Sequence, residues 1–380
     1  MTDTTADIRR QIDALLAAPL FSTAPPEREE RLLELLRSEL TYACARSPRL
    51  RHYFAAWPID FRTADRIADL PYLPVGSFKT DPPLTLVDPE KVVRTVSSSA
   101  TTGQTPSRVA LDAETSRRMV KGVTGIMRDF IGPRRRPYLV IDAPETLRSE
   151  TEIGARGAAI QGLRPFAIDV VCCLKLGSNG TLVLREDVLL DFIETWRDQE
   201  ILVYGFTYVV WQHFVAPLQA KGVKLAMPKA RLLHSGGWKR LQDQAVTRDT
   251  FRAGVAEVLG CLEERVLDFY GMVENIGIVY PDCEHGNKHV PAFGDVIVRD
   301  PLTLGPVAAG QEGLVQVCSA LPTSFPGFLV LTDDIAQVIC YDGCPCGRRG
   351  IAFRFVKRVP KVELRGCGNV ETIRQRLAAA

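Results

Sequence analysis

The sequence predicts a layered α/β fold followed by a smaller β-rich part. From about residue 85 to residue 290, short buried-strand patterns alternate with helical patterns, and this order is typical of layered α/β proteins. Beyond residue 290 the helical patterns fade and short strands dominate. With 380 residues, the chain is also long enough to bury a large core.

The first part of the chain is expected to be helical. Within residues 7–60, the leucines between Leu32 and Leu36 repeat on one face, as they do in an amphipathic helix. We therefore expect residues 1–85 to form a helical segment packed on the main domain.

Residues 86–290 carry the predicted α/β core. Strands are expected at Tyr138–Ile141, Ala167–Leu176, Thr181–Leu184 and Ile201–Tyr204. Helices are expected from Asp187 onward and over Thr207–Ala220. A small β subdomain should follow over 291–356, with strands at Asp295–Val298 and Gly313–Val317, and residues 357–380 should form a tail.

Composition and charge are those of an ordinary soluble globular protein. Hydrophobic residues make up 46% of the chain, charged residues 24%, and the net charge is +2, so nothing favours nucleic acid or an anionic membrane surface. No apolar run is long enough to cross a bilayer, and the polar N-terminus does not resemble a signal peptide. Ten cysteines in such a chain favour thiols, metal ligands or catalysis over a disulfide framework. We expect a cytoplasmic protein.

Residues 97–104 form the strongest candidate for a ligand-binding loop. Their sequence, SSSATTGQ, offers hydroxyl and backbone N–H donors that suit phosphate oxygens. Most Ser/Thr/Gly clusters are simple solvated turns. Three motifs that follow in order add weight to this one: Gly236–Lys239, Tyr270–Glu274 and Leu331–Asp334.

Taken in this order, the four motifs resemble the adenylate-forming superfamily, whose members activate carboxylic acids with ATP. The resemblance implies that the loop holds the β- and γ-phosphates through Ser98, Ser99, Thr101, Thr102 and Gly103. The superfamily usually has glycine where Ala100 stands, which puts the local backbone conformation in question.

The same resemblance assigns the other three motifs. It implies that Gly236 and Gly237 lie beside adenine and that Asp334 binds the ribose hydroxyls. It also implies that the segment beginning with Tyr270 and Gly271 completes the nucleotide site and brings Glu274 to Mg²⁺, a cation that takes oxygen ligands.

Five further segments narrow the resemblance to the LuxE-type acyl-protein synthetase family. These segments are Tyr270–Asn275, Cys283–His289, Leu321–Gly327, Cys344–Arg348 and Arg365–Cys367. Gly76–Lys79 also resembles this family, so the likeness covers nearly the whole chain. The implied fold is a layered adenylate-forming large domain with a small β subdomain. Its C-terminal mobile domain is expected to be largely absent, because the sequence stops at Ala380.

The resemblance names Cys367 as the acyl acceptor. Its thiol would take the acyl group from acyl-AMP and pass it to a partner protein, such as a reductase or a carrier. Arg365 would lower the pKa of this thiol, and the flanking glycines would allow movement. The alternative is that Cys367 is a small buried filler. Arg358, in a partial match to the hinge motif of larger relatives, is expected to contact the ribose or a phosphate.

A second group of residues has the composition of a structural zinc site. Cys344 and Cys346 form a C-x-C pair, and Cys283 with His289 supplies a second pair. His289 is preferred to His285 by a narrow margin. The alternative is free thiols and surface histidines.

The leading hypothesis is an ATP- and Mg²⁺-dependent ligase that passes an acyl group, by resemblance that of a fatty acid, through an acyl-cysteine to a protein. The second is an acid–coenzyme A ligase or an aryl-acid adenylating enzyme, related to phenylacetate–coenzyme A ligases. The third is a degenerate adenylate-binding scaffold. The residues leave open the identity of the acid, the final acceptor and whether the chain forms a homo-oligomer.

Overall fold

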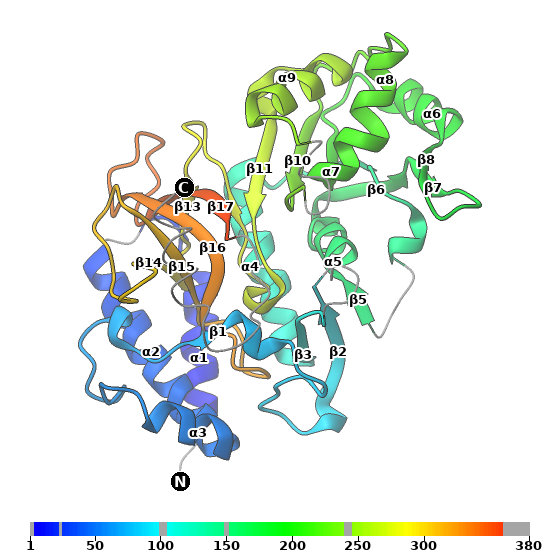
Figure 1. Ribbon diagram of the computed structural model, residues 1–380. Coiled ribbons are helices and arrows are strands. Elements are labelled where there is room, and N and C mark those ends of the chain that lie inside the picture. The colour runs from blue at the N-terminus through cyan, green and yellow to red at the C-terminus, as the bar shows by residue number, and fades with distance from the viewer. Residues whose placement is uncertain (1–3, 23–24, 99–104, 148–151, 239–244, 360–380) are drawn as a thin grey trace.

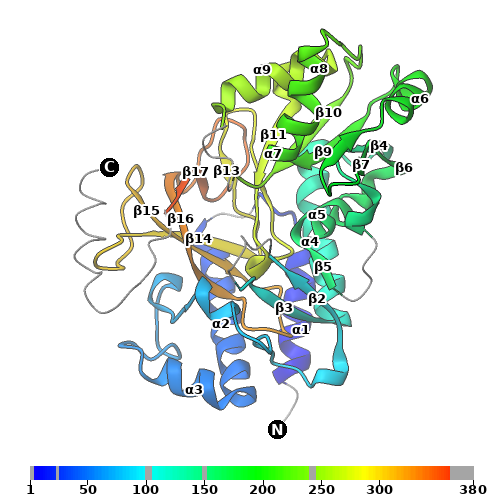
Figure 2. The same cartoon turned by 45° about the vertical axis from the view of Figure 1, so that its right-hand side comes forward.

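The computed structural model describes residues 4–22, 25–98, 105–147, 152–238 and 245–359 (Figure 1). Within these residues, two six-stranded sheets dominate, and each has its own apolar core. Figure 2 shows the N-terminal helices beside the strands of one sheet. Around the other sheet lie helices α6 (Glu186–Trp196), α8 (Ala216–Ala220) and α9 (Arg248–Leu259). Among the described helices, none combines the length and the apolar character needed to span a bilayer.

The mainly parallel sheet has the strand order β12-β11-β10-β9-β4-β6, with β12 antiparallel to β11. Its strands are β4 (Arg136–Val140), β6 (Ala167–Cys172), β9 (Leu202–Phe206), β10 (Arg231–Ser235), β11 (Val266–Tyr270) and β12 (Tyr280–Pro281). The buried runs that the sequence shows at β4 and β9 arise because helices cover both faces of a parallel sheet. Its helices include α4 (Ala113–Ile131), α5 (Ala155–Gly162), α6 (Glu186–Trp196) and α9 (Arg248–Leu259).

Two of the expected elements differ in detail. The expected strand Ala167–Leu176 is divided, because its last residues form β7 (Leu174–Leu176), which pairs with β8 (Leu182–Leu184) in a separate hairpin. The expected helix Thr207–Ala220 is interrupted by a π-helical turn at Trp211–Val215, between α7 (Thr207–Val210) and α8 (Ala216–Ala220). Pro217 lacks a backbone N–H and would clash with the carbonyl four residues earlier in a regular helix, so a wider turn accommodates it.

The second large sheet has the order β13-β17-β16-β15-β14, and β1 (Leu73–Pro74) pairs with β16. Its antiparallel strands are β13 (Lys288–His289), β14 (Gly294–Arg299), β15 (Glu312–Ser319), β16 (Leu329–Cys340) and β17 (Ala352–Arg358). β1 and β13 lie outside the expected subdomain of residues 291–356 and yet belong to its sheet. A smaller sheet contains β2 (Val92–Ser97), β3 (Arg108–Asp112) and β5 (Glu152–Gly154).

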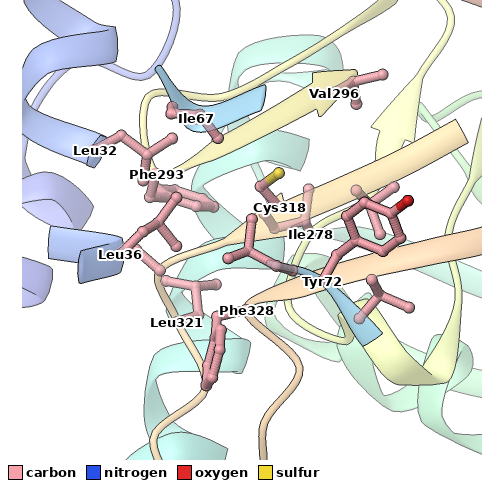
Figure 3. Packing of buried hydrophobic residues seen from close by; sticks show 14 of the residues in the cluster. Leu32, Leu36, Ile67, Tyr72, Ile278, Phe293, Val296, Cys318, Leu321 and Phe328 are labelled. Atoms are coloured by element: carbon pink, nitrogen blue, oxygen red, sulfur yellow. The ribbon is translucent and has the colours of Figure 1, made fainter. Parts of the chain in front are cut away.

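The N-terminal helices share a core with this second sheet. They are α1 (Thr4–Ala17), α2 (Pro25–Arg46) and α3 (Pro48–Ala55). Figure 3 shows Leu32 and Leu36 of α2 close to Phe293, with Leu321 and Phe328 nearby. In addition, the buried Arg28 side chain donates to the Gly294 carbonyl at 2.6 Å and to Asp295 at 3.1 Å. The helices and the sheet therefore form one packed unit.

Candidate active site

The carboxyl ends of three neighbouring parallel strands form one wall of the site. β9, β10 and β11 are in parallel register, so Phe206, Ser235 and Phe269 lie side by side. The chain leaves β10 into Gly236 and Gly237 and leaves β11 into Gly271. Ligands of open α/β sheets bind outside the carboxyl ends of the strands, where these exposed glycines leave room for a flat ring.

The first glycine of this pair is required by the backbone conformation. Gly236 has φ of +77°, a left-handed conformation that costs other residues free energy. A Cβ atom there would also lie 3.0 Å from the ring of Phe206. Gly237 has no neighbouring heavy atom within 4 Å of such a position, so only Gly236 is sterically fixed.

The base of the Ser/Thr/Gly loop is closed by two reciprocal hydrogen bonds. The Ser98 N–H donates to the Ser107 carbonyl at 2.9 Å, and the Ser107 N–H donates to Ser98 Oγ, also at 2.9 Å. Ser107 was not predicted as a site residue, and its side chain also hydrogen-bonds to the carboxylate of Glu274. The loop that begins at Ser98 is thereby anchored to the predicted magnesium ligand.

Glu274 is a buried carboxylate in the short 3-10 turn η9 (Val273–Asn275). Burial raises its pKa, while the hydrogen bond from Ser107 and the positive charges of Arg358 and Lys79 oppose that rise. Gly327 packs on the same turn, since a Cβ there would lie 2.6 Å from the Glu274 carbonyl oxygen. The buried carboxylate is an oxygen ligand of the kind that a hard divalent cation takes, and the positive charges of Arg358 and Lys79 suit the phosphates that would accompany such a cation.

Asp334 of β16 and Arg358 of β17 lie opposite each other in adjacent antiparallel strands. Arg358 donates to both carboxylate oxygens of Asp334, at 2.7 Å and 3.2 Å, and the Tyr270 hydroxyl donates to the same carboxylate at 2.8 Å. Burial and the neighbouring Asp334 raise the pKa of Tyr270 well above its usual value, so the hydroxyl stays a donor. Tyr270 also stacks on Phe355 with 5.6 Å between ring centroids.

These contacts connect the predicted motifs. Ser98 reaches Glu274 through Ser107, and Arg358 acts electrostatically on Glu274 while it binds Asp334. Tyr270 joins Asp334 to the strand next to β10, which leads into Gly236. The contacts thus connect Ser98 with Glu274 and connect Tyr270 with Asp334 and Arg358, while Gly236, Gly237 and Gly271 follow the neighbouring ends of β10 and β11. Ser99, Thr101, Thr102, Gly103 and Cys367 lie outside the described residues.

A buried polar network lies next to the carboxyl ends of these strands, and the sequence motifs did not indicate it. His234 makes a 2.9 Å hydrogen bond with Thr207 Oγ1, and burial lowers its pKa to about 4 although Asp268 opposes this effect. Lys288 bridges Asp268 and Asp282 at 2.7 Å and 3.1 Å. Burial alone would lower the pKa of Lys288, but the two carboxylates outweigh it and raise the pKa.

The predicted metal ligands also meet. One donor atom from each of Cys283, His289, Cys344 and Cys346 lies within 4.8 Å of all the others. Cys346 Sγ is 3.2 Å from His289 Nε2, so the structure brings His289, and not His285, into the group.

Comparison with known proteins agrees with the resemblance deduced from the motifs. The model of the family described as acyl-protein synthetase, LuxE, matches residues 10–377. A long-chain-fatty-acid–luciferin-component ligase from Vibrio harveyi is 36% identical over 138 residues, which are 36% of this chain and 35% of the relative. The ligase of the same name from Aliivibrio fischeri is 29% identical over 140 residues, 37% of this chain and 36% of the relative. Each alignment thus spans about a third of the relative's length.

Solved structures show the same fold. An open form of 2-hydroxyisobutyryl-CoA ligase, in complex with 2-HIB-AMP and CoA, superposes with a TM-score of 0.68 at 17% identity, over 90% of this chain and 78% of that chain. The thioesterification state of that ligase gives a TM-score of 0.67, also at 17% identity, over 90% and 70% of the two chains. The expected layered α/β fold of adenylate-forming enzymes is confirmed, and with a family match over almost its full length, the chain belongs to the LuxE acyl-protein synthetase family.

Proposed function

We propose that this chain uses ATP to activate a carboxylic acid and then transfers the acyl group to a thiol. In the first step, a carboxylate oxygen attacks the α-phosphorus of ATP, the bond to the β-phosphate oxygen breaks, and pyrophosphate leaves with that electron pair. The observation that carries this proposal is two sets of contacts, one from Ser98 through Ser107 to Glu274 and one from Arg358 through Asp334 to Tyr270, with the charge of Arg358 acting on Glu274.

The nucleotide site is proposed to use both groups of contacts. Gly236, Gly237 and Gly271 would border adenine, while Asp334 would accept from the ribose. A carboxylate offers about four lone-pair sites, and Arg358 and Tyr270 occupy three of those on Asp334, which leaves one for a ribose hydroxyl. Arg358 would hold this carboxylate in place and add positive charge near the phosphates.

The triphosphate end is proposed to lie between Glu274 and the loop donors Ser98, Ser99, Thr101, Thr102 and Gly103. Glu274 fits a magnesium ligand, because it is a buried carboxylate whose pKa burial has raised and which a cation would hold ionised. When bound, Mg²⁺ would neutralise phosphate charge. The chain's own contribution is positioning and electrostatic stabilisation, which this type of transfer mainly requires.

The acid, the acyl acceptor and the division into domains are proposed from family membership. The curated relatives are named for long-chain fatty acids and a luciferin component, so we propose a fatty acid as substrate and a protein as final acceptor. Cys367 is the proposed carrier: its thiolate would attack the acyl carbonyl, AMP would leave, and a thioester would remain. We also propose an adenylating core at 86–290 and a β subdomain at 291–356, with residues 1–85 packed against the sheet of that subdomain and the tail at 357–380.

A single-turnover experiment tests this proposal. The protein is mixed with ATP, Mg²⁺ and tetradecanoic acid, and mass spectrometry follows acyl-AMP and the intact protein. We expect acyl-AMP first and then a hydroxylamine-sensitive acyl adduct on Cys367, with the adduct lost in Cys367→Ala and kept in the matched variant Cys261→Ala. An equally stable adduct on Cys367→Ala would refute the carrier, and acyl-CoA formed without protein acylation would favour an acid–CoA ligase.

A further inference from the structure

The cysteine and histidine cluster is separate from the proposed nucleotide contacts. Its four members come from two short segments, the turn before β13 together with β13 itself, and the loop between β16 and β17. Zinc–sulfur bonds of about 2.3 Å and zinc–nitrogen bonds of about 2.0 Å in a tetrahedron of three sulfurs and one nitrogen separate the donors by about 3.5–3.8 Å. The donors of the cluster, all within 4.8 Å of one another, need only small shifts to reach that arrangement.

Both cysteine segments have the same turn geometry. The Gly286 N–H donates to the Cys283 carbonyl at 2.8 Å, and the Gly347 N–H donates to the Cys344 carbonyl at 3.0 Å. Both glycines are left-handed, with φ of +70° and +82°. Each turn curls the backbone around its first cysteine and leaves the sulfur facing the other turn, which is how two half-sites enclose one ion.

The surroundings of the donors also fit bound thiolates. Asn287 Nδ2 lies 3.5 Å from Cys344 Sγ, and its own carbonyl oxygen accepts from Arg354 at 2.8 Å, which fixes the amide orientation. The Arg348 guanidinium lies beside Cys346 and is held there by an ion pair with Asp129 at 2.6 Å. Donors and a positive charge beside the sulfurs are what a site with three thiolates requires, because such a site with Zn²⁺ carries a net charge of −1.

The histidine of the cluster is under-satisfied without a metal. His289 is fully buried, its Nε2 lies beside Cys346 Sγ, and its Nδ1 is buried without a hydrogen-bond partner among the described residues. Burying an imidazole with so little compensation costs free energy. A bond from Nε2 to a metal would hold the ring in the cluster through the nitrogen that already lies beside Cys346 Sγ.

We propose that Cys283, His289, Cys344 and Cys346 bind one structural Zn²⁺ ion that joins β13 to the loop between β16 and β17. With four protein ligands, the ion has no open position for a substrate, so its role is structural. β13 pairs with β17, with Lys288 opposite Phe353 and His289 opposite Ala352. The ion therefore fixes the strand that ends at Arg358 and the strand that carries Lys288 into the buried network.

Metal analysis of the purified full chain tests the site without any activity assay. We expect one zinc per chain in the wild type and in Cys340→Ser, and a loss of most zinc in Cys346→Ser. Cys340 is the matched control because it lies on the same hairpin but outside the group of four donors. Zinc far below one per chain from zinc-supplemented cells, or equal zinc in Cys346→Ser and Cys340→Ser, would overturn the proposal.

Two further measurements use only the wild-type protein, so their results do not depend on whether a variant folds. With Co²⁺ in place of zinc, the protein should show the visible and charge-transfer bands of a tetrahedral thiolate site, and octahedral-type spectra would contradict the assignment. Chelation should expose Cys283, Cys344 and Cys346 together to alkylation and accelerate amide hydrogen exchange in β13 and β17, but not in β14. Unchanged alkylation and exchange after chelation would refute the structural role.

Discussion

Replacing Ser107 by alanine tests the connection between the phosphate loop and Glu274. The change removes only the hydroxyl group, because the two hydrogen bonds that close the loop base use the Ser107 backbone N–H and carbonyl. The backbone bonds to Ser98 should therefore survive, while the Glu274 carboxylate loses the side-chain donor that opposes the effect of its burial.

The expected magnitude follows from the charge on the acceptor. A hydrogen bond to an ionised group contributes about 1.5–3 kcal/mol, which corresponds to roughly 10- to 150-fold in an equilibrium. The bond favours the ionised form of Glu274, so its loss raises the pKa of this carboxyl further. At pH values below the pKa of Glu274, the ionised fraction of this carboxyl should fall by the same factor. The activity that depends on Mg²⁺ should fall with it.

The assay is acid-dependent ATP–pyrophosphate exchange, measured against pH and against Mg²⁺ concentration. For Ser107→Ala we expect the acidic limb of the pH profile to move to higher pH and the Mg²⁺ requirement to increase, with rates approaching the wild type at alkaline pH. Ser98→Ala is the matched control, since it loosens the loop base without touching Glu274 and should weaken ATP binding at every pH. An unchanged acidic limb in Ser107→Ala would refute this reasoning.

The remaining predictions concern individual buried or strained positions. Gly236→Ala should lower the free energy of unfolding by about 1–2 kcal/mol, because its backbone is left-handed, and should raise the KM for ATP. Gly237→Ala should do neither, because a Cβ there meets no neighbouring atom, and equal effects of the two variants would argue against the steric explanation. Burial lowers the pKa of His234 from 6.5 to about 4, so its contribution to the free energy of unfolding should be complete above pH 6.5 and fall by about 3 kcal/mol as the pH drops toward 4. Urea titrations of the wild type should show this loss, and those of His234→Gln should not. Burial raises the pKa of Glu39, whose carboxylate oxygens have no hydrogen-bond partner among the described residues, so the stability linked to it is complete at acidic pH and lost as the pH rises through the folded pKa. Glu39→Gln should therefore be more stable than the wild type at pH 8 and not at pH 4, and a variant that is less stable at pH 8 would show that the carboxylate is compensated.

Local patterns were sufficient to predict the fold class and the family. Alternating strand and helix signals indicated the layered α/β fold, and the family match over residues 10–377 confirms the family that the motifs resembled. The pairing of Cys283 and His289 with a C-x-C segment was also accessible, because short ligand pairs are visible in sequence.

Long-range side-chain contacts could not be predicted in this way. Ser107 is far in sequence from Glu274, and a lone serine after a proline carries no signal for such a contact. The bidentate pairing of Arg358 with Asp334 follows from the register of β16 and β17, which depends on a bulge in that ladder. The π-helical turn before Pro217 likewise reflects how the helix adapts to packing, whereas the period of its apolar residues predicts a regular helix.

The most direct test of the adenylating site is ATP–pyrophosphate exchange over a panel of carboxylic acids, with Glu274→Gln compared to the exposed control Glu264→Gln. The wild type and Glu264→Gln should exchange label only when a suitable acid is present, and Glu274→Gln should lose nearly all exchange while it remains folded. Absence of exchange with every acid, or undiminished exchange in Glu274→Gln, would contradict the assignment of these motifs to one ATP-dependent site.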